Sequence, residues 1–150
     1  MTEADLSATL NDAAASCAYF HTRRATRSLA AHYDRALVQH GLRGTQFTLL
    51  TAIALHGTAT TSQLADTLGT DRTTLTRNLA VLKRDDFINI VDGDDRRERL
   101  HSLSEAGRAK LTAAAPAWQE AQTELAAAIG QANLDSLLRA TSAIAAITAN

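Results

Sequence analysis

Apolar side chains recur at helical spacing in the stretch "DRTTLTRNLAVLKRDD", which covers residues 71–86. Positions i, i+4 and i+7 of this stretch are the leucines that share one face of a helix, Leu75, Leu79 and Leu82. The first half of the stretch carries three threonines, which are mediocre helix formers because their branched Cβ loses rotamer freedom. A helix that only had to pack would favour other residues, so this polar face indicates a further role.

The segments before this helix also read as helices. A long one is expected over residues ~12–40, ended by Gly41. "TQFTLLTAIALHG" predicts the next, with Thr45 as N-cap, Gly57 past its end and three apolar residues facing the core: Phe47, Leu50 and Ile53. "TTSQLADTLG" begins with a capping box from Thr60 to Gln63 and ends at Gly69. A short helix, a tight glycine turn and the leucine-faced helix together indicate a helix-turn-helix.

After Asp86 the pattern changes to that of strands. "FINIV" and "ERLHSL" flank the turn "DGDDRR", which predicts a hairpin. Ser104-Glu105 begins another long helix to about Ala128, kinked at Pro116 and closed by Gly130, and a last helix is expected from about Leu134 to Ile147. A hairpin beside a helix-turn-helix is a winged helix. The predicted fold is therefore mainly α, a winged helix-turn-helix with long helices at both ends.

The 150 residues suit a single domain, 1–150. Within it we expect the winged helix at 42–110, flanked by terminal helices at 1–41 and 111–150. A first helix of this length cannot be buried inside so small a domain. It needs a partner surface, and a second subunit is the expected one, so the terminal segments are predicted to dimerise.

Positive charge is concentrated on the leucine-faced helix. The whole chain has a net charge of −1, but residues 71–84 carry four positive side chains and one negative, a net +3. On a helical wheel the face opposite the leucines consists of Thr73, Arg77, Ala80 and Arg84, flanked by Thr74 and Thr76. A short, polar and positive face suits the major groove of DNA, where arginine pairs with guanine and threonine contacts phosphate or the thymine methyl.

Other classes find less support. The chain has no Gly-rich phosphate loop, nucleophile elbow or paired catalytic carboxylates, so we expect no enzyme and no cofactor. One cysteine and no apolar run of about 18 residues favour a cytoplasmic protein that does not span a membrane. The alternative to a DNA-binding regulator is a dimeric winged-helix scaffold that mediates protein contacts without specific DNA binding.

The segment "DRTTLTRNLAVLKRDDFINIVDGDDRRERLHSLSEAGR" resembles the MarR family of bacterial transcription regulators, as does "RALVQHGLRGTQFTLL". The resemblance extends from about Cys17 to the last helix. It implies a homodimer with interlocked terminal helices that binds a palindromic operator, with recognition helices ~34 Å apart in successive major grooves. It also implies regulation, most often repression, that a small molecule or an oxidant relieves.

The resemblance assigns roles by position. The groove-reading residues would be Arg72, Thr73, Thr74, Thr76 and Arg77. Arg96 and Arg97 would enter the minor groove from the wing, held by Asp94 or Asp95, and Thr60 and Thr61 could bind phosphate at a helix N-terminus. The returning strand departs from the usual apolar pattern, with Glu98, Arg99 and His101. If Arg99 and His101 face the body, the wing is unusually polar.

Two kinds of sensor remain open. Cys17 and His21 lie one helical turn apart with Arg24 beyond, and cationic neighbours make a thiol reactive. One branch of the family senses hydroperoxides through a cysteine in the first helix, with Tyr19 and Tyr33 as candidate partners here. A cysteine that merely packs is the alternative.

The other sensor is a pocket for a small aromatic effector between the terminal helices and the winged helix. Its candidate lining residues are His32, Tyr33, His56 and Trp118, although each also suits a core or dimer interface. Metal sensing is not expected, because the histidines are scattered along the chain.

Overall fold

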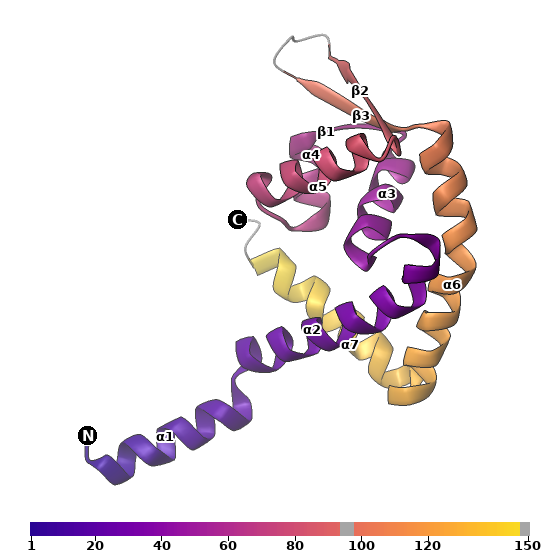
Figure 1. The fold of residues 1–150 in the computed structure, drawn as a ribbon. Coiled ribbons are helices and arrows are strands. Elements are labelled where there is room, and N and C mark those ends of the chain that lie inside the picture. Colours follow the sequence, from indigo (N-terminus) through magenta and orange to yellow (C-terminus); the bar gives the residue numbers. More distant parts are fainter. Residues whose placement is uncertain (94–97, 148–150) are drawn as a thin grey trace.

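The computed structural model describes residues 1–93 and 98–147. Its helices are α1 (Glu3–Ser16), α2 (Ala18–Leu37), the short 3-10 helix η1 (Val38–His40), α3 (Gly44–His56), α4 (Thr61–Leu68), α5 (Arg72–Arg84), α6 (Glu105–Ile129) and α7 (Gln131–Ile147). Its strands are β1 (Thr58–Thr60), β2 (Ile88–Asp92) and β3 (Arg99–Leu103). The prediction of a mainly helical winged helix-turn-helix is confirmed (Figure 1).

The core lies where α3, α4, α5 and the sheet meet. Its largest fully buried side chains come from all of these elements and from the end of α2: Leu37, Leu49, Leu50, Ile53, Leu64, Leu75, Leu82 and Ile88. Every leucine predicted to anchor α5 is buried, as are Phe47, Leu50 and Ile53 of α3. Burying such side chains contributes about 1.5–3 kcal/mol each, which fixes α5 on the body through one face only.

The sheet has three strands in the order β1-β3-β2, all antiparallel. The sequence predicted only the hairpin of β2 and β3. β1 is a three-residue strand, "TAT", too short to show an alternating pattern, and it pairs with the outer edge of β3. His101 is thereby opposite Ala59 on one side and Ile90 on the other.

The predicted first helix over residues ~12–40 is wrong in two ways. The chain forms α1 and α2 with a break at Cys17, whose ψ is 108° and therefore extended. The imidazole of His21 bonds the carbonyl of Ala15, 3.0 Å away, and so helps satisfy the interrupted helix end. The start is also earlier, because Thr2 and Asp5 form a capping box with bonds of 3.2 and 2.9 Å.

Two smaller boundaries differ. Thr45 is not the N-cap of α3, because Arg43 has the extended cap conformation and Asp34 of α2 accepts the N–H of Gly44 at 2.7 Å. The last helix begins at Gln131, directly after Gly130, rather than at Leu134. The other caps follow prediction: Gly41 and Gly69 adopt left-handed conformations, and Ser104 caps α6.

The joint between the wing and α6 is unusually tight. The carbonyl of Phe87, just before β2, accepts the N–H of Ser104, just after β3, at 3.1 Å. A Cβ added at Gly107 would lie 1.9 Å from that same carbonyl oxygen. Only glycine allows this approach, so the base of the wing and the first turn of α6 are held together.

The terminal helices extend away from the core. Every residue of α1 is exposed, and Figure 1 shows it projecting from the rest of the molecule. After Gly130, α7 packs against the end of α6 and buries only Leu134. Within the described residues, no helix is long and apolar enough to cross a membrane.

Candidate nucleic-acid interface and effector cavity

The short helix α4 is built to support α5. Thr60 Oγ1 accepts the N–H of Gln63 at 3.2 Å, and Gln63 Oε1 accepts the N–H of Thr60 at 2.8 Å, so the predicted capping box is confirmed. Gly69 then reverses the chain into α5. At the start of α5, Asp71 accepts the N–H of Thr74 at 2.8 Å, and this bond lowers the pKa of the Asp71 carboxyl. Both ends of the turn are therefore fixed by caps.

The polar face of α5 points to solvent, opposite its buried leucines. The predicted groove-reading residues are all exposed: Arg72, Thr73, Thr74, Thr76 and Arg77. Ala80, which lies between them and Arg84, is exposed as well, and its small side chain would let a binding partner approach the helix closely. Hereafter α5 is called the reading helix.

The arginines of the reading helix differ in their hydrogen-bond and ion-pair partners. Arg72 donates to Ser62 Oγ of α4, a link that sequence reasoning missed because it joins two helices. Arg84 pairs with Asp85 at 3.0 Å in an exposed position, which leaves it partly neutralised. Arg77 forms no hydrogen bond or ion pair with any residue in the described ranges 1–93 and 98–147, so its guanidinium is available to a partner.

Thr60 and Thr61 are less available than predicted. The Thr60 hydroxyl is occupied by its cap, and Thr61 Oγ1 lies 3.0 Å from Nε2 of His101. His101 does face the body, since it is only 3% exposed, whereas Arg99 is exposed. Burial, followed by the charge of Arg99, lowers the pKa of His101, so the ring is neutral near pH 7.

The wing is paired up to its tip, where the N–H of Gly93 donates to the carbonyl of Glu98 at 2.8 Å. The predicted minor-groove residues Arg96 and Arg97, with Asp94 and Asp95, lie outside the described residues. Their assignment therefore stays a prediction.

A cavity of about 550 Å³ lies between α2, α3, α6, the α4–α5 turn and the reading helix. Of the predicted lining residues, Tyr33 and Trp118 line it. His32 instead bonds the carbonyl of Ala121 at 2.8 Å, and His56 bonds Thr67 Oγ1 at 2.9 Å, so the structure places neither in this cavity. This size suits a small organic molecule.

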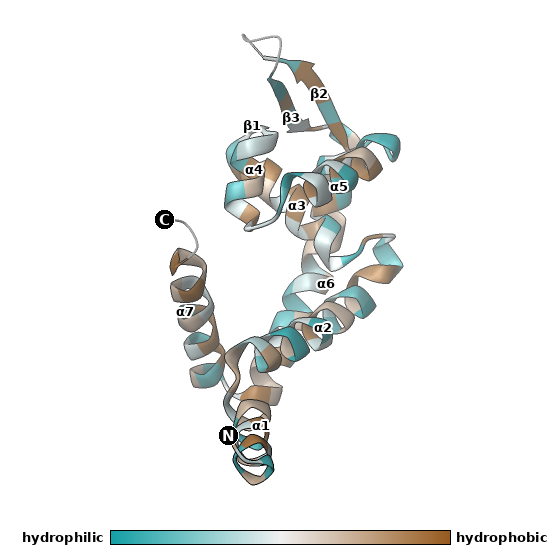
Figure 2. Ribbon diagram, turned by 90° about the vertical axis from the view of Figure 1, so that its left-hand side faces the viewer, coloured by the Kyte–Doolittle hydropathy of each residue, from teal (hydrophilic) through white to brown (hydrophobic). Residues whose placement is uncertain are grey.

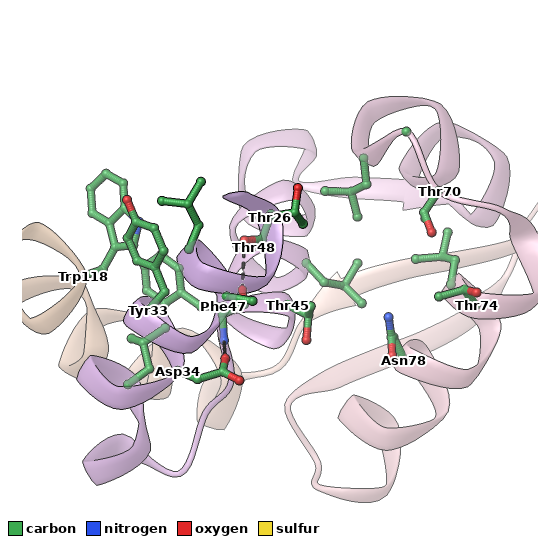
Figure 3. A pocket seen from close by; sticks show the side chains of 18 residues that line it. Thr26, Tyr33, Asp34, Thr45, Phe47, Thr48, Thr70, Thr74, Asn78 and Trp118 are labelled. Carbon is green, nitrogen blue, oxygen red and sulfur yellow. Dashed lines mark hydrogen bonds between the residues drawn. The ribbon is translucent and has the colours of Figure 1, made fainter. Parts of the chain in front are cut away.

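The cavity has an aromatic end and a polar end (Figure 3). Tyr33 and Trp118 lie at one end, where Trp118 stacks on Phe47 with ring centroids 5.9 Å apart. The phenol of Tyr33 donates to Gln122, and burial raises its pKa, so it stays protonated at neutral pH. Thr70, Thr74 and Asn78 lie at the other end. Asn78 was missed because, read along α5, it is simply a polar residue beside the groove face.

Cys17 and His21 lie one turn apart at the start of α2, where the N–H of His21 donates to the carbonyl of Cys17 at 3.1 Å, and the redox role of the pair stays a prediction. Cys17 is half-buried at the break between α1 and α2, and the imidazole of His21 bonds the backbone of Ala15. No group of three or more histidine, cysteine or carboxylate residues in the described part of the chain could hold a metal ion.

A reading helix with an exposed, positive face, supported by a capped helix and flanked by a wing, defines a winged-helix DNA-binding protein. A family model described as MarR family matches residues 40–98. The crystal structure of the transcriptional regulator MosR of M. tuberculosis in complex with DNA is 41% identical, over 86% of this chain and 98% of that one, with a TM-score of 0.74. The chain therefore belongs to the MarR family of transcriptional regulators.

More distant structures share the fold. The transcriptional repressor CouR bound to a 23-mer DNA duplex is 22% identical over 89% of this chain and 95% of that one, with a TM-score of 0.79. Apo MarR from E. coli is 18% identical over 86% and 97% of the two chains, with a TM-score of 0.70. A comparison with curated proteins gives no match.

Proposed function

We propose that this chain is a cytoplasmic, homodimeric repressor that binds a palindromic operator and is released by a small molecule or an oxidant. The exposed basic face of the reading helix carries the proposal, since Arg77 has no partner among the described residues and lies opposite three buried leucines. The 41% identical MosR, solved with DNA, supports the same use of this face.

The reading helix would lie in the major groove with Thr73, Thr76 and Arg77 toward the bases. Arg77 can donate two hydrogen bonds to guanine, and the threonines can contact phosphate or thymine methyl groups. Arg72 is fixed to Ser62, so it would contribute charge near the backbone more than base recognition. Arg96 and Arg97 would reach the neighbouring minor groove from the wing.

The apolar surface of the terminal helices supports the dimer. Large apolar side chains there are exposed in the single chain: Leu6, Leu10, Phe20, Leu138, Ile144 and Ile147. In Figure 2, α1 and α7 lie outside the winged helix and both carry brown, hydrophobic segments. Large apolar side chains exposed on the terminal helices favour burial against another chain. A second copy would place a reading helix on each half of a palindrome.

The cavity supports a small-molecule effector. Its walls come from α2, which is part of the proposed dimer arm, and from the reading helix. A bound molecule would therefore contact both α2, from the proposed dimerisation segment, and the reading helix, which we propose contacts DNA. Oxidation of Cys17, which joins α1 to α2, is the alternative route of release.

Selection of binding sites from a random duplex DNA library, with reduced protein, tests the proposal. We expect an enriched palindrome whose half-sites are one helical turn apart, and affinity that falls steeply with salt. A folded dimer that enriches no motif would refute specific binding and favour the protein-contact scaffold.

A further inference from the structure

The lining of the effector cavity contains no basic side chain. Among the residues that the structure describes, no lysine, arginine or histidine contributes to its wall, and the one charged group is Asp34. An anionic ligand would therefore lose its hydration without gaining a cationic partner, and a buried charge without a partner is strongly unfavourable. The lining thus disfavours carboxylates and phosphates.

The charge of Asp34 is already compensated. Its Oδ1 accepts the N–H of Gly44 at 2.7 Å, at the first residue of α3. The N-terminus of a helix carries partial positive charge, which stabilises a carboxylate placed there. Asp34 is therefore a helix cap, and the cavity offers little extra attraction to a cation.

Hydrogen-bonding capacity remains at the polar end. Two other hydroxyls of the lining are already used. Those of Thr26 and Thr48 donate to the backbone carbonyls of Thr22 and Gly44 in their own helices, each at 2.9 Å. Asn78 and Thr74 face the cavity from the reading helix (Figure 3). Their amide and hydroxyl can both donate and accept, which matches a neutral amide, lactam or hydroxyl group.

We propose that the effector is an uncharged aromatic molecule with one polar group. Its ring lies toward Tyr33 and Trp118, and its polar group bonds Asn78 and Thr74 of the reading helix. The inference rests on the proposed effector role of this cavity and adds the chemical class of the ligand. It predicts selection by charge among molecules of equal shape.

Calorimetric titration with 2-naphthamide and 2-naphthoate at pH 7.4 tests the charge selection. The two probes are nearly isosteric, and only the second is an anion. With the full-length, reduced protein we expect naphthamide to bind at least tenfold more tightly than naphthoate. Equal or tighter binding of naphthoate, or no binding of either probe, would overturn the proposal.

Two matched pairs of variants locate the site. Asn78→Leu should weaken naphthamide binding at least fivefold, whereas Asn89→Leu, on the exposed surface of β2, should leave it unchanged. Thr45→Lys puts a cation in the cavity wall and should strengthen naphthoate binding at least tenfold. Leu55→Lys, which is 84% exposed on the same helix and outside the wall, is its control. If each variant behaves like its control, the assigned site is wrong.

DNA binding separates failure of this inference from failure of the proposed function. Affinity for the selected operator is measured first without a probe and then with saturating naphthamide. Specific operator binding that naphthamide weakens supports both the regulator and the ligand class. Specific operator binding by a protein that fails the charge selection refutes the ligand class and leaves the regulator intact. Naphthamide binding with unchanged operator affinity overturns the effector assignment.

Discussion

At the scale of single residues, Arg77 has the environment of a base-reading side chain. It is exposed in the middle of the reading helix, and no described residue holds its guanidinium. Arg84, by contrast, is paired with Asp85. The sequence placed both arginines on the same face, and only the structure separates them, because the partner of Arg84 lies just past the end of the helix.

We expect Arg77→Ala to relax base preference within each half-site by about 1–3 kcal/mol, the usual value of a bidentate arginine–guanine pair. Site selection with the variant measures this change, with Arg84→Ala as the control. An equal loss of affinity for all sequences would mean that Arg77 contacts phosphate only.

His101 makes folding sensitive to acid. Its pKa is lowered in the folded protein, mainly by burial, so the unfolded chain binds a proton more readily. Stability from the neutral ring is full above pH ~6.5 and is lost as the pH falls through the lower folded value, with a slope of at most about 1.4 kcal/mol per pH unit.

Urea unfolding between pH 7.5 and 5 measures this dependence. We expect His101→Gln to flatten the decline in unfolding free energy, whereas His56→Gln, at an exposed position, keeps it. The same slope in the His101 variant as in the unaltered protein would assign the acid sensitivity to other groups.

At the scale of elements, the reading helix depends on its leucine face. Leu79 is 4% exposed, so Leu79→Ala should cost about 2–5 kcal/mol of unfolding free energy. Thr73→Ala, on the opposite face, should change it by less than about 0.5 kcal/mol. Thermal or urea unfolding of the two variants compares them directly, and similar losses would contradict the one-sided anchoring of α5.

The wing makes a separate prediction. Arg97→Ala should weaken DNA binding chiefly on sites with A·T-rich flanks, because a narrow minor groove attracts arginine. Competition between operators that differ only in their flanks measures this effect. Unchanged flank preference would remove Arg97 from the interface.

Most elements could be predicted from local patterns, and the errors arose where distant contacts decide. Thr60, Gly69 and Ser104 cap by themselves, so they were predictable from sequence. The N-terminus of α3 was misplaced because its cap comes from Asp34 of another helix. β1 exists only through its pairing with β3, and the break at Cys17 carries no proline or glycine to announce it.

The candidate site divides in the same way. Exposure of the reading face follows from helical periodicity, which the sequence displays. The cavity does not, because four helices and the α4–α5 turn form it, and the histidines expected there find partners elsewhere. Asn78 is a candidate only because the fold makes α2 and α5 line a common cavity.

At the scale of the whole molecule, the terminal helices expose large apolar side chains, and we propose that a second copy covers them. Leu138→Glu on α7, which is 52% exposed in the single chain, should dissociate the proposed dimer and lower operator affinity at least tenfold. Leu55→Glu, more exposed but on α3, should do neither. Sedimentation across a range of concentrations checks this, and an intact dimer in Leu138→Glu would place the interface elsewhere.

The tight contact between Gly107 and Phe87 leaves no slack between wing and α6. We therefore expect the wing to move together with α6 when α6 rotates. In the proposed dimer, the relative orientation of the two α6 helices would therefore set the distance between the two wings. A fixed distance tolerates little variation in the spacing of the two half-sites. An operator with one extra base pair between its half-sites should therefore be bound far more weakly than an operator with a mismatched base.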